Sequence, residues 1–148
     1  MINKKGKIIC VGSAGGNLNF LNSDQLKNKF KNARTYQDLL NLAQSFKNSF
    51  LRGTTEIDGW CAKSYYVSKM IINSYPRILS YRSEIEQNDI SVYSIHPGWV
   101  RTDMGGSIAP LTYKQGAECE VFLIELPDGI NKKYQGKYFD RFTISSFE

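Results

Sequence analysis

The feature that most constrains the fold is a short apolar run near the start of the chain, KIICV at residues 7–11. Glycines stand on both sides of the run, and its β-branched residues favour a strand. Because the run is continuously apolar and does not alternate, we expect a strand covered on both faces, as in a parallel sheet. Residues 89–98 and 136–142 show two further strand patterns, the former ending at a Pro-Gly turn.

Helical patterns alternate with these strands, at residues 23–32, 35–51, 61–85 and 112–126. The first has Ser23 or Asp24 in position to cap its N-terminus. The third contains Pro76, which costs about 3 kcal/mol inside a helix, so we expect a kink there or an early end. Strands that alternate with helices predict an α/β fold with a parallel sheet and right-handed crossovers.

Length and composition exclude several classes of protein. The chain of 148 residues is long enough for one domain with its own core. It has no apolar run near the roughly 18–20 residues of a membrane span, and its start lacks the apolar stretch of about 7–15 residues found in secretory signals. Its three cysteines are scattered and odd in number, which favours a reducing cytoplasm over a disulfide framework or a metal site.

The net charge of +5 could attract polyanions such as nucleic acids. The lysines lie in separate clusters, however, and aromatic residues are not interleaved with them. No nucleic-acid-binding motif is present, so a solvated basic surface is the preferred interpretation.

Tyr65 and Lys69 are four residues apart and therefore share one face of the third predicted helix. A neighbouring ammonium favours the phenolate and lowers the pKa of a phenol toward the range in which general acid–base catalysis is efficient. Tyr66 points about 100° away around the helix, so Tyr65 is the candidate. Taken alone, the pair is more simply a chance combination on a solvated helix face.

Polar residues also follow the first two predicted strands. Ser13 comes directly after the first, and HPGWVRTDMGG at residues 96–106 follows the second. Because the carboxyl ends of parallel strands meet at one edge of the sheet, we expect these segments to lie close together. Ser13 could donate a hydrogen bond to a substrate oxygen, or only help the glycines to turn the chain. Trp99 could line an apolar pocket or belong to the core.

Together, CVGS at 10–13, YYVSK at 65–69 and PGWVRTDM at 97–104 resemble the C-terminal half of a short-chain dehydrogenase/reductase of the carbonyl reductase type. That family has N-V-S-S, Y-x-x-x-K and P-G-W-V-x-T-D-M in this order, with a similarly long stretch before the tyrosine. The resemblance runs from Met1 to about Arg141. It implies that residues 1–148 are the catalytic half of one domain, a partial Rossmann-like, doubly wound parallel sheet made of its last three strands with their helices.

The resemblance also implies NADPH-dependent reduction of ketones and aldehydes, small-molecule carbonyl substrates, to alcohols. Tyr65 would give a proton to the substrate oxygen, and Ser13 would hold that oxygen. Lys69 would lower the pKa of the phenol and bind the nicotinamide ribose. The implied cofactor-binding residues are Val11, Tyr65, Lys69, Pro97, Gly98, Val100 and Thr102. The implied substrate-binding residues are Ser13, Tyr65 and Trp99, and no metal is implied.

The family's dinucleotide-binding half has no counterpart in this sequence. A T-G-x-x-x-G-x-G turn is missing, and GSAGG at 12–16 lacks its spacing. The residues that select NADPH over NADH belong to that half, so NAD(H) stays an alternative to NADP(H). Cys10 and Gly12 replace the asparagine and first serine of N-V-S-S.

Three interpretations stay open. The chain is a fragment of a full-length reductase; or a catalytically silent short form, either a decayed copy or a module that binds a partner through the exposed edge of KIICV; or one part of an enzyme completed by a second polypeptide. We expect this chain to be inactive when alone.

Overall fold

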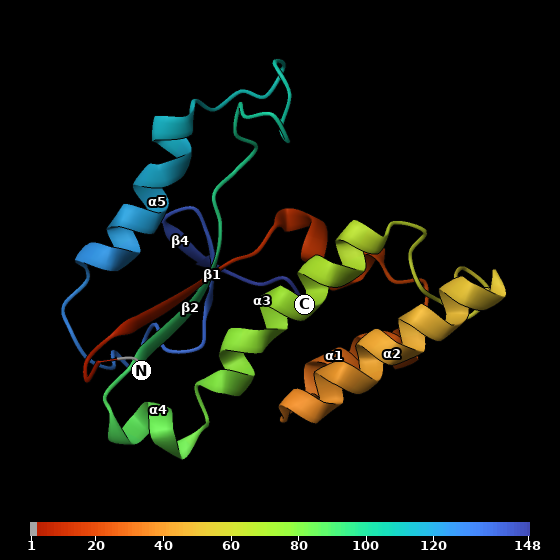
Figure 1. Cartoon of the computed structure of the whole chain (residues 1–148), viewed down its shortest axis with the longest axis horizontal. Coiled ribbons are helices and arrows are strands. Elements are labelled where there is room, and N and C mark those ends of the chain that lie inside the picture. Colours follow the sequence, from red (N-terminus) through yellow and green to blue (C-terminus); the bar gives the residue numbers. More distant parts are fainter. Residues whose placement is uncertain (1–2) are drawn as a thin grey trace.

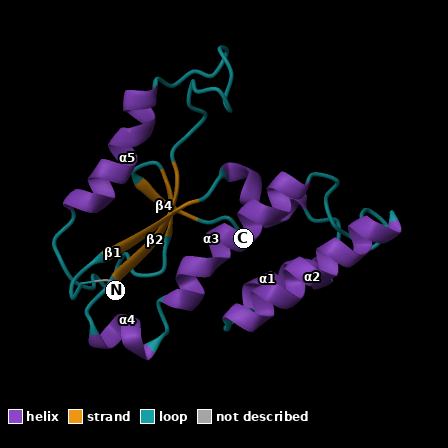
Figure 2. Ribbon diagram, viewed as in Figure 1, coloured by secondary structure: helices purple, strands orange, loops and turns teal. Residues whose placement is uncertain are grey.

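The computed structural model describes residues 3–148, so Met1 and Ile2 of the predicted domain lie outside the described residues. One sheet contains β1 (Lys7–Val11), β2 (Ser91–His96), β3 (Tyr138–Asp140) and β4 (Thr143–Ser145), in that spatial order. The first three strands run parallel, as predicted, whereas β4 pairs antiparallel with β3 and was not predicted. Figure 2 shows the strands together at the centre, between helices.

The helices are α1 (Asp24–Asn32), α2 (Tyr36–Arg52), α3 (Ser64–Leu79), α4 (Ser83–Gln87) and α5 (Tyr113–Glu125). Figure 1 shows α3 on one side of the sheet, with α1 and α2 beyond α3 and farther from the strands, and α5 on the opposite side of the sheet. Helices on both faces of a mostly parallel sheet confirm the predicted α/β architecture. Within residues 3–148, no helix combines the length and apolar character needed to cross a membrane.

Local signals explain where these helices begin. Ser23 caps α1, as expected, because its hydroxyl accepts a backbone N–H of the first turn. Thr35 and Asp38 form a reciprocal capping box at the start of α2, and Thr112 and Gln115 form another at the start of α5.

The degree of burial differs between the two central strands. Ser91 to Ile95 of β2 are buried, as a strand between two layers of helices requires. By contrast, β1 is an edge strand of the described sheet; it is half-buried, and its last residue, Val11, is 48% exposed. The expectation that KIICV is covered on both faces is therefore wrong, whereas the expected unpaired edge is present within residues 3–148.

The helix that contains Pro76 ends early, as expected. Helix α3 ends at Leu79, three residues after Pro76 and before the predicted residue 85, and the short α4 follows it. Pro76 and Ile78 are both buried. Burial of this last turn against the core offsets the one backbone hydrogen bond that a proline cannot make.

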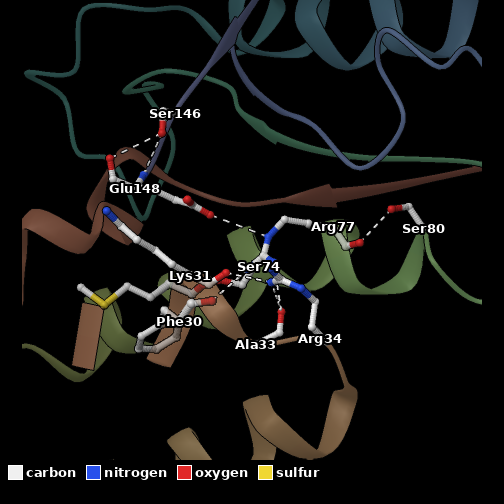
Figure 3. A network of polar contacts seen from close by, with 10 residues as sticks. Phe30, Lys31, Ala33, Arg34, Ser74, Arg77, Ser80, Ser146 and Glu148 are labelled. Carbon is white, nitrogen blue, oxygen red and sulfur yellow. Dashed lines mark hydrogen bonds and ion pairs between the residues drawn. The ribbon is translucent and has the colours of Figure 1, made fainter. Parts of the chain in front are cut away.

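Arg77 of α3 ties three parts of the chain together (Figure 3). Its Nη1 donates to the Ala33 carbonyl oxygen at 3.0 Å and its Nη2 to the Phe30 carbonyl oxygen at 2.9 Å, so it satisfies backbone acceptors at the end of α1. Its Nε lies 3.7 Å from Oε1 of Glu148, near the end of the chain. The outer helix α1 is thereby held against α3.

Replacing Arg77 with Met should lower the free energy of unfolding by about 1.5–3 kcal/mol, because charge-assisted hydrogen bonds to partly buried carbonyls are lost. Urea unfolding of wild type and variant measures this change. The matched control is Arg82→Met, which removes only a surface pair with Glu84 and should leave stability nearly unchanged. Equal stabilities of all three proteins would contradict the assigned role of Arg77.

Candidate active site

An open cleft of about 1060 Å³ lies where β1 and β2 end. Its walls come from the ends of these strands, the first turns of α3, the loop after β2, and α5. All the residues that the sequence singled out line this cleft: Val11, Ser13, Tyr65, Lys69, Pro97, Gly98, Trp99, Val100 and Thr102. The structure therefore brings together three segments that are distant in sequence, at the edge of the sheet where they were expected.

Helix α3 reaches this edge because two glycines leave room for it. A Cβ added to Gly12 would lie 1.9 Å from Oδ1 of Asn73. A Cβ added to Gly16 would lie 2.6 Å from the backbone carbonyl oxygen of Lys69. Any larger residue at either position would push α3 away from the strand end, and Lys69 would move with it.

The Ser13 hydroxyl oxygen stabilises the loop in which it lies, and the hydroxyl hydrogen is still available to donate. Its Oγ accepts a hydrogen bond from the Gly15 N–H at 3.0 Å and so caps the short 3-10 turn Ala14–Gly16. The hydroxyl hydrogen has no acceptor within residues 3–148. A serine hydroxyl can donate one hydrogen bond while it accepts another, so Ser13 can donate to a ligand oxygen in the cleft.

Lys69 lies between the strand end and the tyrosine. Its Nζ donates to the Val11 carbonyl oxygen at 3.1 Å and lies 5.7 Å from the centroid of the Tyr65 ring. Tyr65 is 46% exposed, so its ring is open to the cleft. The next ring, Tyr66, instead packs on Phe20 at 4.5 Å between centroids. The two adjacent tyrosines thus have different surroundings, and Tyr65 is the one beside Lys69.

The loop after β2 is folded back on itself. Gly98 has a φ of +89°, and a Cβ there would lie 2.4 Å from Leu111, so the turn requires glycine. The Trp99 Nε1 donates to the Gly105 carbonyl oxygen at 2.8 Å, and the Gly105 N–H donates to Thr102 Oγ1 at 3.2 Å. Trp99 is 51% exposed. It therefore lies at the rim of the cleft, and its alternative placement in the core is wrong.

His96, the last residue of β2, also lines the cleft, although it was not among the predicted site residues. Burial lowers the pKa of its imidazole below the usual 6.5; Asp140 opposes this, whereas Arg141 and Lys69 add to it. Its position directly before the Pro-Gly turn, at a strand end, is the signal that could have found it.

His96 should therefore titrate below pH 6.5, and because it is the chain's one histidine, its NMR signals are unambiguous. As pH falls through 6.5 toward the lowered pKa, the unfolded chain binds more protons than the folded chain, so stability should fall. Urea unfolding at several pH values should show this loss in wild type and a smaller loss in His96→Gln. A titration midpoint above 6.5 would contradict the burial of the imidazole.

Comparison with known proteins gives three informative likenesses, whereas no protein-family model matches the chain. Carbonyl reductase [NADPH] 1 of Sus scrofa is 34% identical over 132 residues, which cover 86% of this chain and 45% of the pig protein. Salutaridine reductase from Papaver somniferum superposes on 90% of this chain and 45% of its own, with a TM-score of 0.78 and 25% identity. NADPH-bound carbonyl reductase from chicken fatty liver covers 95% and 42%, with a TM-score of 0.56 and 21% identity.

These likenesses confirm two of the expectations from sequence, the family resemblance and the α/β fold class. The chain spans about half the length of the relatives it matches. The roles of the individual site residues stay predictions.

Proposed function

The chain is related to short-chain dehydrogenase/reductases of the carbonyl reductase type over about 45% of their length, and we propose that it forms the catalytic half of an NADPH-dependent carbonyl reductase. The observation that carries this proposal is one cleft that contains the free hydroxyl donor of Ser13, the open phenol of Tyr65 and the ammonium of Lys69. These are the groups that protonation of a carbonyl oxygen needs.

The cleft fits the nicotinamide end of a dinucleotide. Lys69 offers hydrogens to ribose hydroxyls beside the Val11 carbonyl. The loop from Pro97 to Thr102 offers backbone groups and one hydroxyl to the carboxamide, and Gly98 lets that backbone approach closely. NADPH, when bound, supplies the hydride that reaches the carbonyl carbon.

The chain's own residues would manage the oxygen and its proton. The Ser13 hydroxyl donates to the carbonyl oxygen and polarises it, and Tyr65 transfers its phenolic proton to that oxygen as negative charge develops. The ammonium of Lys69 stabilises the negative charge left on the phenol oxygen. Trp99 at the rim gives the substrate carbonyl an apolar wall. The product is the alcohol.

The exposed edge of β1 supports a second part of the proposal. No strand pairs with its outer side within residues 3–148, and such an edge binds further strands readily. We propose that it receives the strands of a dinucleotide-binding half, on the same or a separate polypeptide, in the cytoplasm. The alternative is a catalytically silent chain that uses this edge for another partner.

A hybrid protein tests the proposal. In this hybrid, the part of the pig carbonyl reductase that has no match in this chain is fused to the start of this chain. In a second format, the two parts are co-expressed as separate polypeptides. We expect the hybrid to oxidise NADPH with an aromatic aldehyde, measured by absorbance together with alcohol formation. This chain alone should bind NADPH weakly and show no turnover, because it lacks the glycine-rich phosphate-binding turn.

In the hybrid, Tyr65→Phe should lower kcat by about 10²–10⁴-fold, because it removes only the general acid. The matched control is Tyr66→Phe, which keeps the ring packed on Phe20 and should retain activity. A hybrid that binds NADPH but reduces no aldehyde or ketone, while the pig enzyme does, would overturn the proposed function and favour the silent chain.

A further inference from the structure

Asn73 is a buried polar residue on α3 that no part of the proposed reaction uses. It is only 1% exposed, and it lies four residues after Lys69 and eight after Tyr65. These three residues therefore lie along one side of the helix, with Asn73 at the deepest position. A buried carboxamide must be hydrogen-bonded to be tolerated, so its partners indicate what it does.

Both partners of Asn73 belong to Ser13. The Ser13 N–H donates to Asn73 Oδ1 at 3.3 Å, and Asn73 Nδ2 donates to the Ser13 carbonyl oxygen at 2.9 Å. One side chain thus satisfies both backbone groups of Ser13, as a neighbouring strand would. A carboxamide is suited to this pairing because it carries a donor and an acceptor side by side.

The surrounding backbone is shaped to admit this side chain. Gly12 and Gly16 lie on either side of the hydrogen bonds between Ser13 and Asn73, and a Cβ on Gly16 would lie 2.4 Å from Asn73 Nδ2. On Gly12, the Cβ would displace Asn73 Oδ1. Gly12 and Gly16 are therefore required where Asn73 meets the loop, in addition to any part they take in the turn itself.

We propose that Asn73 is a positioning residue that holds the Ser13 hydroxyl at a fixed place relative to Tyr65. Ser13 follows β1 and Tyr65 begins α3, so their separation is set by the bonds that join the loop to the helix. Besides the Lys69 bond to the Val11 carbonyl, these are the two bonds of Asn73. The inference rests on the proposed function, in which both hydroxyl groups must reach one carbonyl oxygen.

The same loop gives a direct measure of this position. A Cβ on Gly15 would lie 3.3 Å from Cε1 of Tyr65, so the Gly15 α-hydrogens lie near that ring. Displacement of the loop from α3 would change the nuclear Overhauser effect between Gly15 and the Tyr65 ring. It would also speed hydrogen exchange of the Ser13 amide, which loses its acceptor.

The experiment compares wild type with Asn73→Leu, which keeps the number and branching of the side-chain heavy atoms but removes both hydrogen bonds, and with Asn73→Ser, a smaller side chain for use if the leucine variant does not fold. The control is Ser74→Ala, because Ser74 is equally buried but bonds only within its own helix, to the Met70 carbonyl oxygen at 2.8 Å. NMR on the full chain alone should show exchange of the Ser13 amide about tenfold faster in the Asn73 variant than in wild type or control. The Gly15–Tyr65 effect should weaken in parallel.

The second measurement uses steady-state kinetics of the hybrid, with rates expressed per folded molecule. The Asn73 variant should lose about 10²-fold in kcat, as expected for a displacement near 1 Å, with little change in KM for the aldehyde. Ser74→Ala should leave both constants unchanged. A residue that only stabilised the fold would lower the folded fraction without this change in kcat.

Unchanged Ser13 exchange and an unchanged Gly15–Tyr65 effect in the folded Asn73 variant would overturn the inference, as would a kcat equal to that of the control. If the wild-type hybrid reduces no carbonyl compound, the proposed function fails. The NMR comparison then still decides whether Asn73 sets the position of Ser13.

Discussion

The close approach of α3 to the carboxyl end of β1 is the constraint on which the site depends. It exists because Gly12 and Gly16 have no side chains at the crossing and because Asn73 fills the space between the two segments with a satisfied carboxamide. Burial of such a group is favourable only when both its donor and its acceptor are bonded. The packing of α3 against the end of β1 therefore also places Tyr65 and Lys69 beside that strand end.

The second strand completes the cleft in a related way. Its loop turns back at Gly98 and is pinned near α5, where a Cβ on Gly116 would lie 2.5 Å from a methyl group of Val100. The cleft is thus framed by rigid elements, a strand end and a helix on each side. Catalytic groups held by packing of this kind keep their geometry better than groups on free loops. An apolar rim and three convergent polar groups are the chemistry of a small-molecule site.

The sequence predicted most of this architecture, because buried strands and capped helices carry strong local signals. It did not predict β4, since residues 143–145 are exposed and have no apolar pattern. The continuation of α3 past Pro76 depends on tertiary burial, which local propensity does not record. The candidate residues were found from motif order, but Asn73 was missed, although its spacing of four residues from Lys69 and eight from Tyr65 places it on the same side of the helix.

In the proposed reaction, the hydroxyl groups of Ser13 and Tyr65 both reach one carbonyl oxygen. The most direct measurement is a crystal structure of the hybrid protein with NADP⁺ and an unreacted ketone in the cleft. We expect the ketone oxygen within about 3.2 Å of both the Ser13 Oγ and the Tyr65 phenol oxygen. A ketone oxygen bound to His96 or elsewhere in the cleft, out of reach of these two groups, would contradict it.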